Sequence, residues 1–410
     1  MTELDIRHFL RAGDQVFVGQ ATAEPPRLVE ALVAAAQEIA DLSVVCGYSL
    51  TPAWNGTTET GPRIKAYAAH GALRKVEARG LIDPLPVHLH HVDRLIREDV
   101  LRPDVVLLQV GPLDQASGTY PLGLTVDYVS VAAERARVVL VEVNDNVPIT
   151  RATRALPAER VTAAFPTSAA LATDPARPAN DVEFAVAANV ARLVPDNATI
   201  QLGAGALANA IGAQLEERRG LRVRSGLAGD WLIGLHDAGA LDPTPGSSAT
   251  GMVLGGPALY DLLGRTDLVE LRPHAELLAP EALAACSRYI SVNSAIEVSL
   301  DGSLGAEVVA GRYVGAVGGQ GDFFRASRTA PAGAAILALA STHPNGDSRI
   351  VASLSGPVTS TKSDVDYVVT EWGIADLRGK TLSERRRDLI AVAHPDHRAG
   401  LGAELAEVLS

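Results

Sequence analysis

Residues 199–211 read TIQLGAGALANAI: a short apolar run, two glycines, and then the pattern of a helix. Gly203 and Gly205 let the backbone approach a ligand closely, and a helix that begins there directs its unpaired N–H groups outward. Such a loop favours a phosphate or a carboxylate. With Ala208 it also fits the dinucleotide variant G-x-G-x-x-A, but the next strand ends without the acidic residue that would bind a ribose. The sequence therefore predicts an anion or nucleotide-tail loop, with a plain tight turn as the alternative.

The same strand and helix patterns alternate along the chain. Runs such as LSVVC, DVVLLQV and RVVLVEV are rich in Val and Leu and lack period-two alternation, which is typical of strands buried on both faces of a parallel sheet. These three runs cover residues 42–46, 104–110 and 137–143. Further strands are expected in the second half at 199–202, 221–224, 334–340, 350–354 and 365–369. Residues 27–40 show helical spacing of apolar residues behind Pro25 and Pro26. The alternation predicts an α/β fold.

Composition limits the function classes. Of 410 residues, 47% are hydrophobic and 20% charged, so packed structure is expected. The net charge of −12 has the wrong sign for a general nucleic-acid or anionic-membrane binder. Cys46 and Cys286 provide no disulfide framework, and neither a signal-peptide pattern nor a membrane-length apolar run occurs. We expect a soluble, cytoplasmic protein.

The length favours two domains, and residues 165–180 (FPTSAALATDPARPAN) form the expected boundary because they hold three prolines and no clear helix or strand pattern. We therefore expect an α/β domain over 1–170 and a second one over 181–410. Residues 16–19 and 199–203 both run from a strand to a glycine that precedes a helix. This similarity suggests duplicated halves.

A second glycine-dense loop, VGGQGDF, covers residues 317–323 and suits close contact between backbone and ligand, with a flexible hairpin as the alternative. Arg312, Arg325 and Arg328 flank it and could face phosphates. The stretch GIADLRGKT at 373–381 has one residue too many for a phosphate-binding P-loop. In VHLHHVD, neighbouring histidines on an expected strand would point to opposite faces, so no metal site is predicted.

Several segments together resemble the acetyl-CoA hydrolase/transferase family, whose best-known members are 4-hydroxybutyrate and related CoA-transferases. They occur in family order over nearly the whole chain. The matching segments are GQATAEPPRLVEAL (19–32), LQV (108–110), GLTVDY (123–128), EVN (142–144), QLGAG (201–205), SVNSAIEV (291–298), GGQGDF (318–323) and DYVVTEWGIADLRGK (366–380).

The resemblance implies two related α/β domains with mostly parallel sheets and the active site in the cleft between them. It also implies a CoA thioester as substrate rather than a permanently bound cofactor, a small carboxylic acid as second substrate, and a homodimer. By position, residues of two loops would contact CoA or lie beside the thioester: Gly203, Ala204, Gly205, Ala206, Leu207, Gly318, Gly319, Gln320 and Gly321.

One departure from the family concerns the nucleophile. Family transferases use a glutamate, about twenty residues after the first glycine loop, that forms a glutamyl-CoA thioester. Gly226 occupies that position, and Asp230 four residues later is retained. Asp230 and Glu297 are the candidate replacement carboxylates, with Asp322 and His236 as further general bases.

These observations leave three hypotheses. The first is a family enzyme that transfers CoA between an acyl-CoA and a carboxylic acid. The second is hydrolysis or carbon–carbon cleavage of a CoA ester without a glutamyl-CoA intermediate, in which backbone N–H groups of the glycine loops stabilise the developing oxyanion. The third is a catalytically inactive protein that binds CoA esters.

Overall fold

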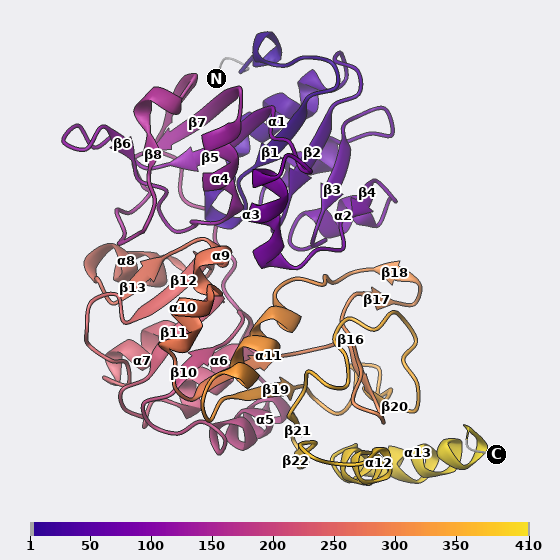
Figure 1. Cartoon of the computed structure of the whole chain (residues 1–410). Coiled ribbons are helices and arrows are strands. Elements are labelled where there is room, and N and C mark those ends of the chain that lie inside the picture. The colour runs from indigo at the N-terminus through magenta and orange to yellow at the C-terminus, as the bar shows by residue number, and fades with distance from the viewer. Residues whose placement is uncertain (1–3, 409–410) are drawn as a thin grey trace. The chain divides into compact units, whose positions relative to one another are not determined.

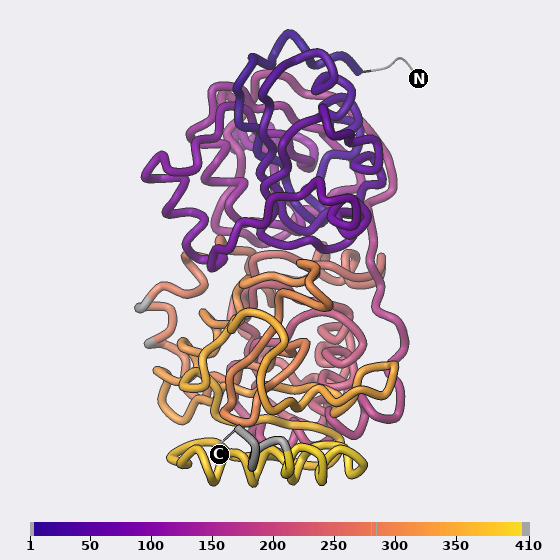
Figure 2. The backbone as a smooth tube through the Cα atoms, turned by 90° about the vertical axis from the view of Figure 1, so that its right-hand side faces the viewer, coloured from indigo at the N-terminus to yellow at the C-terminus, as the bar shows by residue number. Residues whose placement is uncertain are grey.

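The computed structural model describes residues 4–408. The chain divides into two compact units, each assembled from several segments (Figures 1 and 2). The first unit contains Met1–Pro175, Thr244–Leu277 and Val314–Gly318, and the second contains Ala176–Pro243, Leu278–Tyr313 and Gly319–Ser410.

The first unit is built on a seven-stranded sheet in the order β4-β3-β2-β1-β5-β7-β9, and every neighbouring pair in it is parallel. Its strands are β1 (Gln15–Val18), β2 (Ser43–Cys46), β3 (Arg63–Ala66), β4 (Ile82–Pro84), β5 (Val105–Val110), β7 (Val138–Asn144) and β9 (Ala163–Thr167). All six residues of β5 are buried. The continuous Val- and Leu-rich runs thus became central parallel strands, as predicted.

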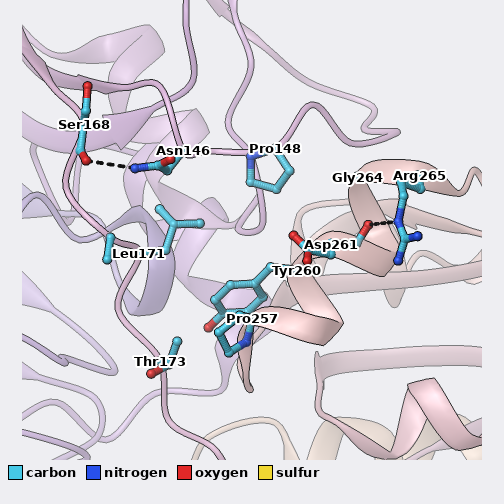
Figure 3. Close-up of a pocket in the computed structure, with 11 residues that line it drawn as sticks. Asn146, Pro148, Ser168, Leu171, Thr173, Pro257, Tyr260, Asp261, Gly264 and Arg265 are labelled. Carbon is cyan, nitrogen blue, oxygen red and sulfur yellow. Dashed lines mark hydrogen bonds between the residues drawn. The ribbon is translucent and has the colours of Figure 1, made fainter.

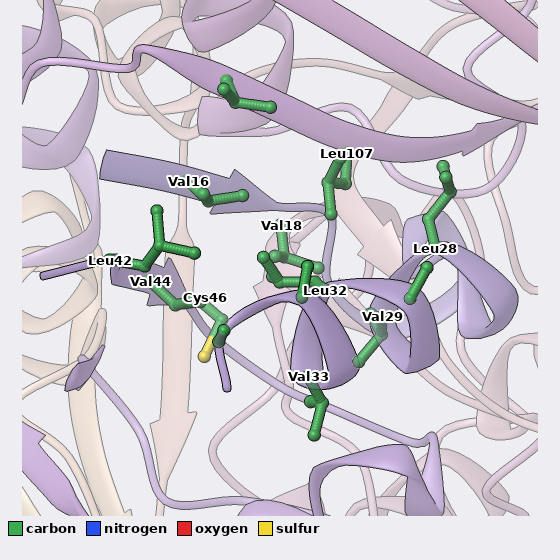
Figure 4. Packing of buried hydrophobic residues seen from close by; sticks show 14 of the residues in the cluster. Val16, Val18, Leu28, Val29, Leu32, Val33, Leu42, Val44, Cys46 and Leu107 are labelled. Atoms are coloured by element: carbon green, nitrogen blue, oxygen red, sulfur yellow. The ribbon is translucent and has the colours of Figure 1, made fainter. Parts of the chain in front are cut away.

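Helices pack on this sheet through apolar faces. Pro26 opens the first turn of α1 (Pro26–Ala35), where its missing N–H costs no helical hydrogen bond. Figure 4 shows Leu32 of α1 beside Val18 of β1, and Leu28 and Val16 belong to the same buried cluster. The other helices of this unit are α2 (Leu73–Glu77), α3 (Leu89–Arg97), α4 (Tyr128–Arg135), α8 (Pro257–Arg265) and α9 (His274–Leu277), with 3₁₀ turns η1 (Arg7–Phe9), η2 (Ala21–Ala23), η3 (Pro52–Gly56) and η4 (Ala158–Arg160).

Residues 244–277 belong to the first unit although they follow part of the second in sequence. They contain the parallel pair β12 (Ser248–Val253) and β13 (Val269–Leu271), and the first unit also has the short antiparallel pair β6 (Thr119–Tyr120) and β8 (Leu156–Pro157). Backbone bonds fix the segment, since Val126 N donates to Gly251 O at 2.8 Å and Leu271 N donates to Arg151 O at 2.9 Å. These units therefore differ from two domains that are each continuous in sequence.

Within the second unit, strands lie in the order β11-β10-β14-β19-β21-β22, parallel except for the last pair. They are β10 (Thr199–Gln201), β11 (Arg222–Ala228), β14 (Tyr289–Asn293), β19 (Ala334–Ala338), β21 (Tyr367–Thr370) and β22 (Gly373–Asp376). A small sheet in the order β16-β15-β20 and an antiparallel hairpin accompany them. These short strands are β15 (Glu297–Ser299), β16 (Leu304–Gly305), β17 (Val308–Val309), β18 (Arg312–Tyr313) and β20 (Ile350–Val351).

The helices of the second unit are α5 (Asp181–Ala191), α6 (Ala206–Gln214), α7 (Trp231–Asp237), α10 (Pro280–Ala284), α11 (Gln320–Thr329), α12 (Leu382–Ala391) and α13 (Pro395–Val408). In Figure 2, α12 and α13 follow each other in yellow along one side of this unit. No helix in the described range is long and apolar enough to span a membrane.

The two sheets repeat one topology. In the first sheet, β1 lies between β2 and β5. In the second sheet, β10 lies in the same way between β11 and β14. Beyond β5, the first sheet continues with β7 and β9. Beyond β14, the second continues with β19 and β21. This common order confirms that the two halves are related α/β structures.

The break between the two units after Pro175 lies inside the expected boundary of 165–180. Three local details differ from expectation. Residues 165–167 of the expected boundary complete the edge strand β9, where Pro166 is tolerated because an edge strand pairs on one side only. The strand expected at 221–224 continues to Ala228, so Gly226 is a strand residue. Residues 89–91 of the histidine motif start helix α3 instead of lying in a strand, with His88 before its first turn.

Candidate functional site

The first glycine loop joins β10 to α6 in the second unit. Gly205 immediately precedes α6 with φ of +108°, a conformation that L side chains rarely adopt. A Cβ atom at Gly203 or Gly205 would meet no other atom within 4 Å, so the space beside both backbones is open. Trp231 Nε1 donates to Gly203 O at 2.8 Å and fixes the loop from one side. The loop thus combines an open backbone surface with the amino end of a helix, which favours a negatively charged or polarised group.

Gly226, which the family resemblance aligns with the nucleophile position, lies in the strand next to the one that leads into this loop. Gly226 is buried in β11, which pairs in parallel with β10. The neighbouring Ser225 Oγ donates to Leu202 O at 2.6 Å, directly before Gly203. Gly226 therefore lies in the strand beside the first glycine loop, and its role as the former nucleophile position stays a prediction.

Asp230 follows the same strand and precedes the first turn of α7. Its side chain makes no capping hydrogen bond to that helix. A Cβ atom on the preceding Gly229 would lie 3.4 Å from Ala204 Cβ, so the turn that holds Asp230 packs against the first glycine loop. Asp230 is therefore a predicted carboxylate that lies in a turn packed against the first glycine loop.

Glu297 is placed differently. It is buried in β15, and its Oε1 accepts hydrogen bonds from Ser355 N at 2.5 Å and Ser355 Oγ at 2.9 Å. These bonds tie the carboxylate to the loop after β20. Such an arrangement is typical of a side chain that holds a strand and a loop together.

The second glycine loop spans the boundary between the two units, which falls between Gly318 and Gly319. Gly318 has φ of +56°, and its carbonyl accepts from Leu89 N at 3.1 Å within the first unit. Gly319 precedes α11, and Gly321 is buried in the first turn of that helix. The backbone of this loop, like that of the first, belongs to the start of a helix.

The loop's glutamine does not point freely into solvent. Gln320 Nε2 donates to Ser294 O at 2.7 Å, and Gln320 Oε1 accepts from Ser360 Oγ at 2.8 Å. Both ends of this carboxamide are therefore used within the second unit. The carboxamide therefore has two partners inside the protein, and contact of Gln320 with CoA stays a prediction.

The flanking arginines and the further bases are also placed. Arg325 pairs with Asp364 at 3.1 Å and Arg328 with Asp366 at 3.2 Å, so both guanidinium groups already have carboxylate partners. Asp322 is buried in the first turn of α11, and His236 lies in the last turn of α7. No group of three or more His, Cys, Asp or Glu side chains in residues 4–408 is arranged to hold a metal ion.

One pair at the carboxyl ends of the strands was missed from the sequence. Gln201 at the end of β10 and Asn293 at the end of β14 exchange two amide hydrogen bonds, of 3.4 Å and 2.8 Å. β10 and β14 are neighbours, and the carboxyl ends of parallel strands are the usual place for ligands in α/β sheets. The sequence did show an amide residue at the end of each of these two expected strands. It could not show that the two strands are neighbours, which is what brings the amides together.

The segment 19–24 of the first unit forms a buried polar network. Glu24 accepts from Ser49 Oγ at 2.5 Å and from Trp54 Nε1 at 2.8 Å; burial raises the pKa of Glu24, and these bonds oppose the rise. Gln20 donates to Asp127, and burial raises the pKa of Asp127 to about 6. The network fixes the turn after β1 at the carboxyl end of the first sheet.

A separate pocket of about 820 Å³ lies in the first unit (Figure 3). Residues 168–173, the loop after β7 and helix α8 line it. Asn146 Nδ2 donates to Ser168 O at 2.9 Å, and Arg265 Nε donates to Asp261 O of its own helix at 3.1 Å. The residues that line this pocket include none of the predicted site residues.

Comparison with protein families gives two matches. Residues 1–158 match the acetyl-CoA hydrolase/transferase N-terminal domain, and residues 255–405 match the acetyl-CoA hydrolase/transferase C-terminal domain. Together these matches include the second glycine loop, while the first loop and Gly226 lie between them.

Individual proteins are similar over nearly the whole chain. The 4-hydroxybutyrate coenzyme A transferase of Clostridium kluyveri is 32% identical over 94% of this chain and 92% of its own length. The succinyl-CoA:cyclohexane-1-carboxylate CoA transferase of Geobacter metallireducens is 31% identical over 96% and 91%. The crystal structure of RipA from Yersinia pestis superposes with a TM-score of 0.90 at 29% identity, covering 97% of this chain and 95% of that one.

Proposed function

Since the chain belongs to the acetyl-CoA hydrolase/transferase family, we propose that it transfers CoA between an acyl-CoA and a small carboxylic acid. A CoA-thioester-processing enzyme is what the family membership supports directly. The observation that carries the proposal to this chain's own residues is the open backbone at Gly203 and Gly205 before α6.

In this proposal the backbone of the glycine loops receives the thioester. The first loop, Gly203 to Leu207, contacts CoA, and the N–H groups around Gly319 face the thioester oxygen. Donors fixed in position before the reaction stabilise the charge that develops on that oxygen when the carbonyl carbon is attacked. Gln320 contributes its backbone only, because its side chain is bonded to Ser294 and Ser360.

Gly226 favours a second candidate, hydrolysis or carbon–carbon cleavage of a CoA ester without a glutamyl-CoA intermediate. In hydrolysis, water adds to the thioester carbonyl, the C–S bond breaks, and a carboxylic acid and free CoA leave. Asp230 is the proposed carboxylate that accepts the proton from water, because its turn packs on the first glycine loop. Glu297 is the weaker candidate because Ser355 occupies its carboxylate.

Mass spectrometry of all CoA species separates the candidates. The protein is incubated with an acyl-CoA and a different free acid. A new acyl-CoA without free CoA supports transfer, whereas free CoA and the released acid support hydrolysis or cleavage. Binding of acyl-CoA with neither product identifies an inactive CoA-ester-binding protein and contradicts both catalytic proposals.

Substitutions identify the carboxylate. Asp230→Asn should lower turnover by at least about 100-fold if Asp230 is the base. Glu297→Gln should mainly lower stability. Equal turnover in Asp230→Asn and the parent protein would exclude Asp230.

Restoring the family residue tests the assignment of position 226. Gly226→Glu should introduce acyl exchange and a carboxylate that borohydride reduces only after acyl-CoA is added. Gly226→Gln is the matched control because it has the same size and no nucleophile. Equal exchange in both variants would show that position 226 is not the nucleophile position.

The proposed setting is the cytoplasm, and the proposed assembly is a homodimer. The first follows from the sequence and the second from the family resemblance. Light scattering after size-exclusion chromatography tests the assembly, and a monomer mass would reject the dimer.

A further inference from the structure

A path of hydrogen bonds links the two glycine loops within the second unit. Gln201, which ends β10 before the first loop, exchanges amide bonds with Asn293 at the end of β14. The next residue, Ser294, accepts from Gln320 Nε2 at 2.7 Å. Gln320 begins α11 and follows Gly319 of the second loop directly. The path therefore runs from one loop to the other across two neighbouring strands.

Within this path, Gln320 is the residue that directly follows the second loop, and its side chain makes two hydrogen bonds. Its side chain is 9% exposed, and Ser360 Oγ, on a residue only 2% exposed, donates to its Oε1 at 2.8 Å. A buried carboxamide with its donor and acceptor both used is held firmly, because breaking either bond leaves a buried polar group without a partner.

The two glycines before Gln320 offer no side-chain anchor for the loop. Gly318 and Gly319 carry no side chain, and Gly319 makes no side-chain cap to α11. Glycine also has the widest backbone freedom of any residue. Side-chain anchoring of the loop therefore begins at Gln320, in addition to the backbone bond of Gly318 to Leu89 and the burial of Phe323 and Phe324 further along α11.

We propose that Gln320 is a positioning residue. Its carboxamide sets the backbone of Gly319 and Gly321 relative to the end of β14 and, through Asn293 and Gln201, relative to the first glycine loop. That the loops hold a thioester rests on the proposed function, whereas the restraint on the loop is a property of the free protein.

Hydrogen exchange on the full chain without ligand tests the restraint. Gln320→Ala should speed exchange of backbone amides in residues 318–323 by about tenfold, because two buried hydrogen bonds are lost. Gln214→Ala is the matched control, since Gln214 is exposed at the end of α6. Unchanged exchange in Gln320→Ala, or an equal increase in the control, overturns the proposal.

The conservative variant Gln320→Glu gives a readout that a simple packing role would not produce. Its carboxyl group can accept from Ser360 in either charge state but can donate to Ser294 O only when protonated. Because burial raises the pKa of a carboxyl group, loop exchange should approach that of the parent protein at acidic pH, where the carboxyl is protonated, and that of Gln320→Ala at about pH 8, with all variants compared at the same pH. Equal behaviour at both pH values argues against the bond to Ser294 as the restraint.

Kinetics connect the restraint with the reaction. With acyl-CoA as substrate, Gln320→Ala should lower kcat by at least about tenfold and change KM by less than about threefold, because misdirected N–H groups affect the transition state more than binding. An equal loss in kcat and in CoA affinity would indicate a binding role instead. If the parent protein neither binds nor converts acyl-CoA, the proposed function fails, and the exchange measurements still decide the role of Gln320.

Discussion

At the scale of single residues, two buried acids of the first unit show how burial controls charge. Asp93 of α3 is 4% exposed, and Asp127 precedes α4 with no exposed surface. Burial and the nearby Asp127 raise the pKa of Asp93 to about 7, while Arg97 and Arg154 oppose the rise. Because a buried charge is costly, burial shifts the equilibrium of both acids towards the protonated form.

This has a measurable consequence for stability. A folded-state pKa above the unfolded value of 3.8 means that the contribution of Asp93 is full below about pH 4 and is lost as the pH rises to about 7. Asp93→Asn removes this titration. We expect it to increase the free energy of unfolding by about 2–4 kcal/mol at pH 8 and by much less at pH 5.

Chemical denaturation at both pH values checks this expectation. Asp83→Asn is the control substitution, since Asp83 is exposed in β4 of the same unit. A gain for Asp93→Asn that is the same at both pH values would refute burial as the cause.

At the scale of elements, helix starts follow from local sequence. Asn180 accepts from Glu183 N at 2.9 Å and its own N–H donates to Glu183 Oε2 at 3.0 Å, a reciprocal cap at the start of α5. Thr381 and Glu384 form the same arrangement at α12. These caps satisfy N–H groups that a helix leaves unpaired, so three- or four-residue sequence patterns suffice to define them.

The cap of α5 is testable by substitution. Asn180→Ala removes the side-chain acceptor and should lower the free energy of unfolding by about 1 kcal/mol. Asn180→Asp keeps an acceptor at the same position and should stay within about 0.5 kcal/mol of the parent protein. Thermal and chemical denaturation measure both variants, and equal losses would show that the cap hydrogen bond contributes nothing.

At the scale of the whole molecule, the first unit includes residues 244–277, which follow residues 176–243 of the second unit in the sequence. Glu270 of β13, 7% exposed, pairs with Arg151 at 3.0 Å, and Arg154 pairs with Glu276 of α9 at 2.8 Å. Backbone hydrogen bonds from Val126 N to Gly251 O and from Leu271 N to Arg151 O also attach this segment. A domain limited to 1–170 lacks all of these partners.

We therefore expect a fragment of residues 1–170 to fold poorly. Without segment 244–277, Arg151 and Arg154 lose carboxylate partners, and the face of α3 that packs against α9 is exposed. The fragment should show no cooperative thermal transition by circular dichroism, whereas the full chain does. A cooperative transition with native-like near-ultraviolet signal would establish 1–170 as an independent domain.

How far sequence reasoning reached depends on the range of the interaction. Runs such as 104–110 and 137–143 predicted buried parallel strands because a strand covered on both faces must be apolar throughout. Pro25 and Pro26 predicted the start of α1 for a similarly local reason. Residues 165–167 were misjudged, because the pairing of β9 with β7 outweighed the local proline signal.

By itself the sequence determined the α/β class, the two glycine loops and the family, since strand burial, backbone freedom and motif order are written in consecutive residues. Only the tertiary structure decided which distant side chains meet. It bonded Gln320 to Ser294 and Ser360, joined Gln201 to Asn293, and tied Glu297 to Ser355. Hydrogen bonds act over about 3 Å, so partners separated by 26 to 92 positions in the chain are fixed by strand order and packing, which no local pattern records.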